Sequence, residues 1–590
     1  MEIYSTRKIK FELELSELKK KYNLLSTIRL ICGLFIFITG YYFLKTYDSF
    51  YLIAIFILIV VFVFLMKKHD AIGKQKKLKE AIIAINSEEL NYLNSNKLPF
   101  QNGIEFNDFS HPYCYDLDIF GNHSLFQNLN RTSTYIGKIT LASRLMKLQS
   151  NDEILKNQEA IKELSEQLDW RQNFSAMAKI SKDSKLAYQK INNWISSKSD
   201  DFSTKDSILS FASPLVILGS FVAYLVTSND LFLKIIGYLF VINFGIIGRF
   251  YKRIKIENET TTEVDAIIKQ YGFLIESIEN NEFKSEKLIL LKQKLVSEKS
   301  KSSDELKKLS ELFSRMDTIN NLVVSLIFNG FFLFHVHTLK SVLNWKKLHL
   351  SSLKNWLSVI GEYEVLNSLS NFSYNNSNFA FPEINTNYEI SFSNLSHPLL
   401  NKKSRIGNDV TFQPQSFMIL TGSNMSGKST FLRSLGINMV LTGIGSPVCA
   451  TKANVHPLPI LVSMRLSDSL SDSESYFFAE IKRLKLIMDN LESNRAFVLL
   501  DEILRGTNSD DKRNGTIEVV KKMISKNVIG AIATHDIEVC LTTNEFPNQL
   551  TNKCFEVEIV DNELHFDYKL RDGICKNKSA TFLMKKIGVI

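Results

Sequence analysis

Long apolar runs separated by charged stretches dominate the first half of the chain. They form two pairs: Ile28–Leu44 with Phe50–Met66, and Ile208–Val226 with Leu231–Gly248. Each run is close to the roughly 17–25 residues that a helix needs to cross a bilayer. The linkers within the pairs are only a few residues long. The pattern therefore predicts two transmembrane helical hairpins. The alternative is that these are buried core helices of a soluble protein.

Basic residues flank these pairs on their outer sides. They precede the first run, follow the second and follow the fourth: Arg7, Lys8, Lys10, Lys19, Lys20, Lys21, Lys67, Lys68, Lys74, Lys76, Lys77, Lys79, Arg249, Lys252, Arg253 and Lys255. The short linkers carry only Lys45, Asp48 and Asp230. Because positively charged flanks stay on the cytosolic side, both hairpins are predicted to enter and leave the cytoplasmic (inner) membrane from the cytosol. Every large segment would then lie in the cytosol.

A fifth apolar run, Leu322–Leu339, differs from the other four. It contains Asn329, His335 and His337. If this run crossed the membrane, everything after it would lie outside the cytosol. We therefore expect it to be a buried core helix, with its histidines as packing or surface residues.

Much of the remaining sequence before the last third has helical periodicity. Apolar residues recur at three- and four-residue spacing in Asn122–Lys147, Asp152–Gln172, Glu257–Met316 and Trp345–Tyr374. A content of 10 prolines and 24 glycines in 590 residues suits a largely helical chain. We expect residues 1–100 to hold the first hairpin, 101–376 to form a helical core and lever region with the second hairpin inserted, and 377–590 to form a separate domain.

Charge and cysteine content refine this outline. The net charge is +9, but much of the lysine lies beside the apolar runs. We therefore interpret the positive charge first as the cytosolic flank of membrane segments, and second as a binding surface for a polyanionic partner. The six cysteines form no CxxC pair and have no histidine at metal-ligand spacing. They are typical of reduced thiols in a cytosol-facing protein.

The segment Thr421–Thr430 carries the most specific motif. It reads TGSNMSGKST and matches the phosphate-binding pattern G-x-x-x-x-G-K-[ST]. Gly422 and Gly427 let backbone N–H groups converge on phosphates, where the next helix adds its dipole. Lys428 would reach the β- and γ-phosphates of ATP, and Ser429 would place its hydroxyl on Mg²⁺.

A second motif follows further along the chain. The apolar run Phe497–Leu500 is typical of a buried parallel strand and delivers Asp501 and Glu502 at its C-terminal end. Asp501 suits the metal, and Glu502 suits polarisation of the attacking water. Together the two motifs predict an ATP hydrolase that uses Mg²⁺.

These motifs resemble those of the MutS family of DNA mismatch-repair ATPases. The loop contains Asn424 and Met425, which generic phosphate-binding loops lack. Other similar segments are Ser396–Leu399 (SHPL), Asp501–Asn508 (DEILRGTN), Ala533–His535 (ATH), Leu564–Gly588, the upstream SLFQNLNRTSTYIGKITLASRLMKL and Leu366–Phe372 (LNSLSNF). The likeness is discontinuous over Asp116–Gly588. It implies an α/β P-loop ATPase domain of the MutS/ABC type after a mostly α-helical core and lever region.

The resemblance also implies a composite site in a homodimer. In such ATPases two nucleotide domains pair head to tail, and a signature segment of the partner closes each ATP. Here that segment is Ser471–Glu480, with Ser475 acting in trans. Asp472 and Glu474 depart from the family, because acidic side chains near a γ-phosphate are unfavourable unless they point away.

The resemblance assigns the remaining roles. Lys428, Glu502 and His535 would be catalytic, with His535 sensing the γ-phosphate; a satisfied core histidine is the alternative. Ser429 and Asp501 would hold Mg²⁺, and Arg505 and Asn508 would link the two sites. The nucleotide would contact Gly422, Ser423, Asn424, Met425, Ser426, Gly427, Lys428, Ser429 and Thr430. The motif order also matches ABC-type ATPases, but their LSGGQ signature is missing.

Departures from the family shape the functional hypotheses. Met1–Gly121 shows no sign of the family's mismatch-reading domain, whose wedge kinks DNA. The first hypothesis is a membrane-anchored MutS-like ATPase whose cycle moves the lever helices, with DNA as the possible ligand. The second is a transporter-like machine, although the hairpins hold few polar residues besides Thr39 and Asn243. The third is a nucleotide-gated scaffold for a protein partner.

Overall fold

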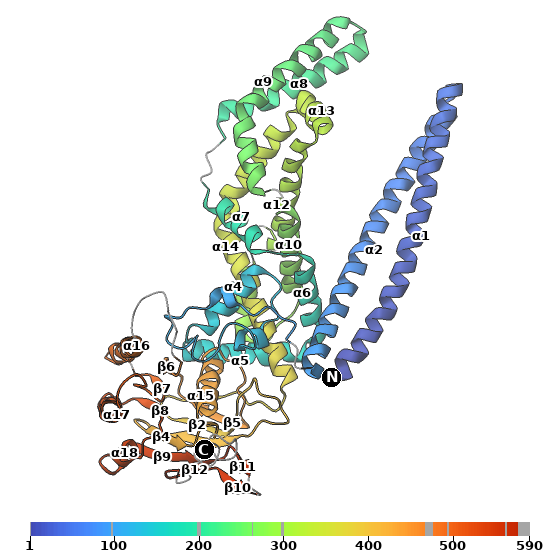
Figure 1. Ribbon diagram of the computed structural model, residues 1–590. Coiled ribbons are helices and arrows are strands. Elements are labelled where there is room, and N and C mark those ends of the chain that lie inside the picture. The colour runs from blue at the N-terminus through green and yellow to red at the C-terminus, as the bar shows by residue number, and fades with distance from the viewer. Residues whose placement is uncertain are drawn as a thin grey trace.

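The structure is a computed structural model that describes residues 2–95, 98–197, 202–261, 264–296, 300–465, 476–492, 495–560 and 563–575. The described chain is mostly helical up to Asn375 and then becomes a domain of mixed helices and strands. This agrees with the predicted order of a helical region followed by an α/β domain (Figure 1).

The first hairpin consists of two very long helices, α1 (Glu2–Thr46) and α2 (Ser49–Ser95). They pack against each other along the hairpin and extend away from the body of the molecule (Figure 1). The predicted apolar runs are the distal parts of these helices, where large side chains face outward. Phe37 is 79% exposed and Phe56 is 67% exposed.

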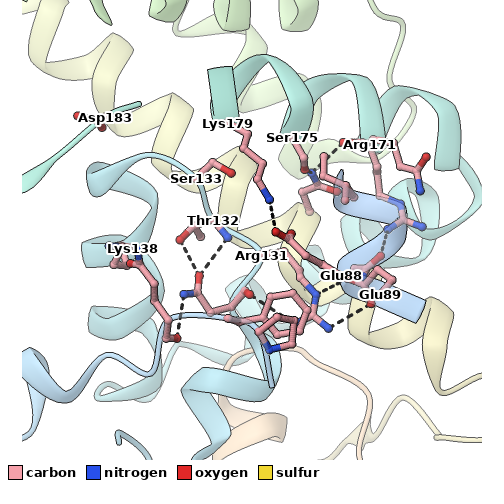
Figure 2. Close-up of a pocket in the computed structure, with 18 of the residues that line it drawn as sticks. Glu88, Glu89, Arg131, Thr132, Ser133, Lys138, Arg171, Ser175, Lys179 and Asp183 are labelled. Atoms are coloured by element: carbon pink, nitrogen blue, oxygen red, sulfur yellow. Dashed lines mark hydrogen bonds and ion pairs between the residues drawn. The ribbon is translucent and has the colours of Figure 1, made fainter. Parts of the chain in front are cut away.

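The proximal end of this hairpin docks on the helical core; we call Tyr4, Arg7, Asn86 and Glu89 its foot. The Arg7 Nε–H and one Asn86 amide N–H both donate to Gln172 Oε1, at 2.8 and 3.1 Å. The Glu89 carboxylate pairs with Arg131 beside a cavity of about 290 Å³ (Figure 2). A small apolar cluster of Phe11, Ala81, Ile82 and Ala176 completes this contact.

The helical core surrounds the lower part of one long helix, α14 (Phe334–Asn375). The other members are η1 (Ile104–Phe106), α3 (Leu125–Leu129), α4 (Tyr135–Leu145), α5 (Asn151–Glu166) and α6 (Leu168–Ile180). Gly137 and Gly361 allow α4 and α14 to approach closely, since a Cβ on Gly137 would collide with Glu364. The stretch Asp152–Gln172, predicted as helical, belongs to two helices, α5 and α6, which are separated at Gln167.

The upper part of α14 belongs to an arm that ends in the second hairpin (Figure 1). Its elements are α7 (Lys185–Ser196), α8 (Thr204–Thr227), α9 (Asp230–Thr261), α10 (Asp265–Glu279), α12 (Ser302–Asp317), η2 (Thr318–Asn320) and α13 (Leu322–Phe332). Between α10 and α12, α11 (Glu286–Gln293) packs on α5 of the helical core. Helices α10 and α12 pack on each other. The stretch Glu257–Met316, predicted as helical, consists of the end of α9 and three shorter helices, α10, α11 and α12.

Among the described residues, α1, α2, α8 and α9 are long and apolar enough to cross a membrane, by length and composition alone. The turn between α1 and α2 and the turn between α8 and α9 lie at the same end of the molecule, remote from the strands (Figure 1). Insertion of these hairpins in a membrane remains a prediction.

The run Leu322–Leu339 is not the single buried helix that we predicted. It breaks at Leu333, which has φ of 49°, and α13 and α14 meet at an angle of 84°. After the break, His335 and Leu339 are fully buried, as expected. Before it, α13 exposes large apolar side chains, among them Leu322 at 81%. Sequence periodicity could not show the break because no proline or C-terminal glycine marks it.

The C-terminal domain is built on two main sheets. The larger has the strand order β12 (Leu570–Asp572), β9 (Leu550–Phe555), β4 (Phe417–Gly422), β8 (Ile529–Ala533), β7 (Phe497–Asp501) and β6 (Ile460–Ser463). The smaller has the order β1 (Glu383–Ile384), β5 (Lys452–Val455), β2 (Ile390–Leu395) and β3 (Asn408–Phe412). A short ribbon joins β10 (Glu558–Val560) and β11 (Glu563–His565).

Helices of this domain follow the parallel strands of the larger sheet. They are α15 (Lys428–Gly443), α16 (Tyr476–Asn490), α17 (Ser509–Ser525), α18 (Ile537–Leu541) and the short η3 (Thr542–Asn544). All strand pairs from β9 to β6 are parallel, and only β12 is antiparallel to its neighbour. Parallel strands covered by helices are buried on both faces, which explains why β4, β7 and β8 are apolar and buried.

Candidate active site

Three neighbouring strands bring the sequence motifs together. In the order β4, β8, β7, each strand ends on the same edge of the larger sheet because all three are parallel. β4 leads into the glycine-containing loop, β7 ends in Asp501, and β8 is followed by Thr534 and His535. The carboxyl edge of a parallel sheet is where such folds bind ligands.

Two glycines shape the loop between β4 and α15. Gly422 has φ of 155°, and a Cβ there would lie 2.9 Å from the Phe555 carbonyl oxygen. Gly427, the residue before α15, has φ of 100°, which strains any other residue, and it packs against the Tyr568 ring. The hydroxyls of Ser423 and Ser426 are buried without a hydrogen-bond partner. The loop thus leaves polar groups unsatisfied at a helix N-terminus, which suits an anionic ligand.

Lys428 folds back over this loop. Its Nζ donates to the carbonyl oxygens of Gly422 and Ser423, at 2.9 and 3.0 Å, and lies 3.4 Å from His535 Nε2. The side chain is 6% exposed. Burial lowers the pKa of Lys428, partly opposed by the nearby carboxylates of Glu502 and Asp501. A buried ammonium group that contacts neutral carbonyl oxygens can form a stronger interaction with an anion.

Asp501 offers the best fit for a metal ion. Its Oδ1 is buried with no hydrogen-bond partner, and the Ser429 side chain lies close enough to oppose the effect of burial on its pKa. Burial raises the pKa of Asp501. An orphaned carboxylate oxygen beside a hydroxyl matches Mg²⁺, which takes one or two protein ligands and completes its shell with phosphate oxygens and water. No group of three or more His, Cys, Asp or Glu side chains converges within the described part of the chain.

Glu502 and His535 form a close pair. The distance from His535 Nε2 to Glu502 Oε1 is 2.7 Å. Hydrogen bonding to His535 lowers the pKa of Glu502 to about 2, against an opposing contribution from burial. Glu502 has φ of 48°, so the chain turns sharply where β7 ends. The geometry presents an ionised, oriented carboxylate beside the loop.

Arg505 and Glu480 fix this turn in place. Arg505 Nε donates to the Glu502 carbonyl oxygen at 2.9 Å, and its Nη2 donates to that of Asp501 at 3.2 Å. The buried Glu480 carboxylate on α16 accepts from the backbone N–H groups of Leu504 and Arg505. Arg505 was predicted to link two sites, whereas within this chain it holds the Asp501–Glu502 turn. Asn508 caps α17 by accepting from the Asp511 N–H.

A cavity of about 490 Å³ opens over the loop. Asn424 to Phe431 line one wall and Glu502 contributes to the lining. The lining also includes His397, Asn408 and Tyr568, to which the sequence analysis assigned no role in the site. Burial and two nearby arginines lower the pKa of His397 to about 4. The SHPL segment was the one available signal for His397; Asn408 and Tyr568 gave none.

The helical core reaches this domain through two aspartates in the loop before α3. Asp116 Oδ1 accepts from the N–H groups of Met464 and Arg465, both at 2.8 Å, and Oδ2 pairs with Arg483 on α16. Asp118 pairs with Arg465 and with Arg433 on α15. These contacts hold both flanks of the segment predicted to be the signature. Ser475 itself lies outside the described residues, as does the end of the chain from residue 576.

Comparison with known proteins agrees with this geometry. The family model for MutS domain V matches residues 418–589. The DNA mismatch repair protein MutS of Clostridium perfringens is 30% identical over 251 residues, covering 41% of this chain and 27% of that protein. That of Thermotoga neapolitana is 34% identical over 183 residues, covering 30% of this chain and 22% of that protein. Human MutS protein homolog 4 is 30% identical over 194 residues, covering 31% and 20%.

The chain spans about a quarter of the length of the curated relatives it matches. The similarity thus identifies the C-terminal domain, and the predicted resemblance to the MutS family is confirmed there. The residues that the family model matches, 418–589, do not include the hairpins.

Proposed function

We propose that this chain, which belongs to the MutS family through its domain V, is a membrane-anchored ATPase that uses Mg²⁺. The observation that supports hydrolysis is the meeting of Lys428, Asp501, Glu502 and His535 at the ends of three adjacent parallel strands. Such a set contains a phosphate-binding cation, a metal ligand and an ionised carboxylate with an orienting partner, which phosphoryl transfer to water requires.

Each residue has a separate task in this mechanism. The loop Ser423–Gly427 and the Lys428 ammonium would bind the phosphates, with Lys428 leaving the carbonyls that it now contacts. Ser429 and Asp501 would hold Mg²⁺, which neutralises charge on the phosphate oxygens. Glu502, ionised because of its lowered pKa, would orient the attacking water, and His535 would keep that carboxylate in position.

ATP turnover by the purified protein tests this function. Lys428→Ala and Glu502→Gln should each lose roughly 10²-fold or more, by analogy with removal of a preorganised charge-stabilising group. Lys402→Ala changes an exposed lysine of the same domain and should keep the rate. Turnover that survives both site variants would disprove the assignment.

Anchoring in the cytoplasmic membrane, with domain V in the cytosol, is the second part of the proposal. Its support is the exposure of the apolar runs and the location of both hairpin turns at one end of the molecule. Large outward-facing apolar surfaces of this kind are typical of lipid contact. Membranes washed with alkaline carbonate should retain the protein; release into the soluble fraction would contradict anchoring.

A homodimer with Ser475 acting on the partner's nucleotide is the third part, and its basis is the family resemblance. Mixing subunits gives a sharp test. Lys428→Ala and Ser475→Ala should each be inactive alone, whereas their mixed dimer contains one site with both residues intact. Partial recovery of ATP turnover on mixing supports action in trans. Absence of recovery, with mixed dimers demonstrated, would contradict it.

DNA is the ligand that we propose for the arm, since the relatives are named as DNA mismatch repair proteins and the chain has a net charge of +9. A basic surface that binds phosphates gives a steep fall of log K with log salt concentration. Duplex binding measured with and without ATP, at two salt concentrations, is the test. Absence of binding at low salt would favour the alternative of a scaffold for a protein partner.

A further inference from the structure

The short helix α13 (Leu322–Phe332) is unusually apolar on its outer surface. Its exposed large side chains, with their exposed fractions, are Leu322 81%, Val323 63%, Leu326 50%, Ile327 44%, Phe328 45% and Phe332 52%. A continuous apolar face on a single helix is unfavourable in water and marks an interaction site. The question is what covers it.

The position of α13 identifies the partner. It lies beside the base of the second hairpin, at the top of the arm (Figure 1). The Asn243 amide on α9 donates to the Gly330 carbonyl oxygen at 2.7 Å, and the Phe240 and Phe331 rings are 5.0 Å apart. Gly330 is required here, since a Cβ would lie 2.1 Å from the Phe240 ring. One side of α13 therefore packs directly on the apolar run of α9, and its exposed apolar side chains lie next to the hairpin.

The break after α13 satisfies its own polar groups. Asn329 Oδ1 accepts from the His335 backbone N–H at 3.0 Å and contacts His335 Nδ1 at 2.9 Å. The Leu333 N–H donates to the Asn329 carbonyl oxygen, and the His337 N–H to that of Leu333. A helix break at membrane depth is tolerated only where such groups are satisfied internally.

Length and charge limit how deep α13 can lie. Eleven residues extend about 16 Å, roughly half of a 30 Å hydrocarbon core, so α13 cannot cross it. The flanking helices carry cations near it: Arg315 on α12 and Lys340 on α14. Cations at such positions favour the cytosolic headgroup region. The chain would thus enter and leave on the same side, which keeps domain V in the cytosol.

We infer that α13 is a third membrane element, inserted in the cytosolic leaflet beside the second hairpin without spanning the bilayer. The inference rests on the proposed membrane anchoring and adds a lipid-binding surface that belongs to the lever arm itself. Since α12 and α14 flank α13 directly, any tilt of the arm would change how deeply this helix lies in lipid. The partner is the acyl-chain region of the bilayer.

Environment-sensitive fluorophores on single introduced cysteines test this placement in lipid nanodiscs. Leu326→Cys reports on α13 and Phe56→Cys on the first hairpin. Leu348→Cys is the matched control. Leu348 is also a leucine, is 73% exposed, and lies on α14 outside the apolar runs and α13. Protein without an introduced cysteine, labelled in parallel, gives the background of its six own cysteines. Lipids brominated on their acyl chains quench buried probes, and aqueous iodide quenches exposed ones.

The expected result is strong quenching by brominated lipid at Leu326→Cys and Phe56→Cys, and quenching by iodide at Leu348→Cys. Leu322→Cys, at the other end of α13, should follow Leu326→Cys, which guards against a local distortion. If Phe56→Cys is quenched by lipid while both α13 probes respond to iodide, the inference fails and the anchoring stands. If Phe56→Cys also responds to iodide, the anchoring itself fails.

Discussion

The two hairpins have similar apolar surfaces but are attached to the molecule in different ways. The first is held at its foot, where polar and charged side chains of α1 and α2 contact the helical core. The second is held along α9, which packs on α7, α12, α13 and α14; within its apolar run, Asn243 donates to Gly330 on α13. One hairpin is docked by the end remote from its turn, and the other is docked along α9, including part of its apolar run.

This difference indicates how each hairpin would follow the rest of the chain. Glu89, at the foot of the first, accepts from Asn371 and Asn375 at the end of α14, at 2.9 and 3.0 Å. That end of α14 leads directly to β1 and the C-terminal domain. The first hairpin is therefore joined to the end of α14 by the buried Glu89 carboxylate and by the Tyr4 hydroxyl, which donates to Oδ1 of the same two asparagines. The second is coupled to the arm at several points: Asn243 donates to Gly330, Lys340 on α14 donates to Ser207 on α8, and Glu257 on α9 accepts from Trp194.

Removing the carboxylate at the foot should have the largest effect. Glu89→Ala leaves Arg131 buried without its ionic partner, a type of change that costs about 3–5 kcal/mol. Hydrogen exchange should report this loss as easier local opening of α2 and of the end of α14. Glu88→Ala is the adjacent control: Glu88 pairs with Lys179 and both are about one third exposed, so its loss should cost at most about 1 kcal/mol. Similar small effects in both variants would disprove the coupling.

The stability of the helical core next to the foot should also depend on pH, through the buried carboxyl group of Glu364. Burial raises the pKa of Glu364 from 4.5 to about 7, although hydrogen bonds from Thr134 and Ser133 act in the opposite direction. Between these values Glu364 binds more proton in the folded than in the unfolded chain, so its contribution to stability is fully present below pH 4.5 and is lost as the pH rises through about 7. At 1.36 kcal/mol per pKa unit the change is up to about 3 kcal/mol.

Hydrogen exchange at the start of α4, measured over this pH range, checks the sign. Glu364→Gln removes the titrating group and should flatten the dependence. A stability that instead increases from pH 5 to 7 would mean that the hydrogen bonds outweigh burial.

The contact within the second hairpin should contribute less. Asn243→Ala removes the donor to Gly330, and such bonds between membrane helices contribute about 0.6–1.7 kcal/mol. The measurement is thermal unfolding in nanodiscs together with exchange in α13. Thr39→Ala is the control, since the Thr39 hydroxyl bonds only to carbonyls of its own helix. If Asn243→Ala lowered stability as much as Glu89→Ala, the two hairpins would not differ in how strongly they are attached.

The smallest effect on stability is expected where α1 and α2 face each other just beyond the foot; we call this part of the first hairpin its stalk. Lys79 on α2 and Glu14 on α1 are 2.6 Å apart, with side chains 26% and 38% exposed. An exposed pair of this kind contributes at most about 1 kcal/mol and is screened by salt. Glu14→Gln should therefore change exchange in the stalk only at low salt. If Glu14→Gln changed hydrogen exchange equally at molar salt concentration, the effect would not be due to charge.

Much of the site could be predicted because its residues lie in contiguous motifs. Gly422 to Thr430 form one loop and its following helix, and Asp501 and Glu502 directly follow one strand. The helical hairpins were predictable for the same reason, since apolar runs and short linkers are local features. The outcome for α13 shows the limit: its composition predicted burial, but the break at Leu333 turned half of the run outward.

Other parts of the site depended on contacts between distant residues. Glu480 holds a turn 24 residues later, and Asp116 holds backbone N–H groups 348 and 349 residues later. No periodicity or spacing links such positions. His397, Asn408 and Tyr568 share a cavity only because β2, β3 and the segment before β12 meet there.

By itself, the sequence determined which chemistry the chain contains and which segments are too apolar for water, because both depend on residues close together in the chain. The tertiary structure decided how these parts are joined: Glu89 to the end of α14, Asp116 to the flanks of the signature segment, and α13 to the second hairpin. Each of these joints consists of a few hydrogen bonds and ion pairs across a long sequence separation. Their partners are selected by packing of the whole fold, which no local pattern encodes.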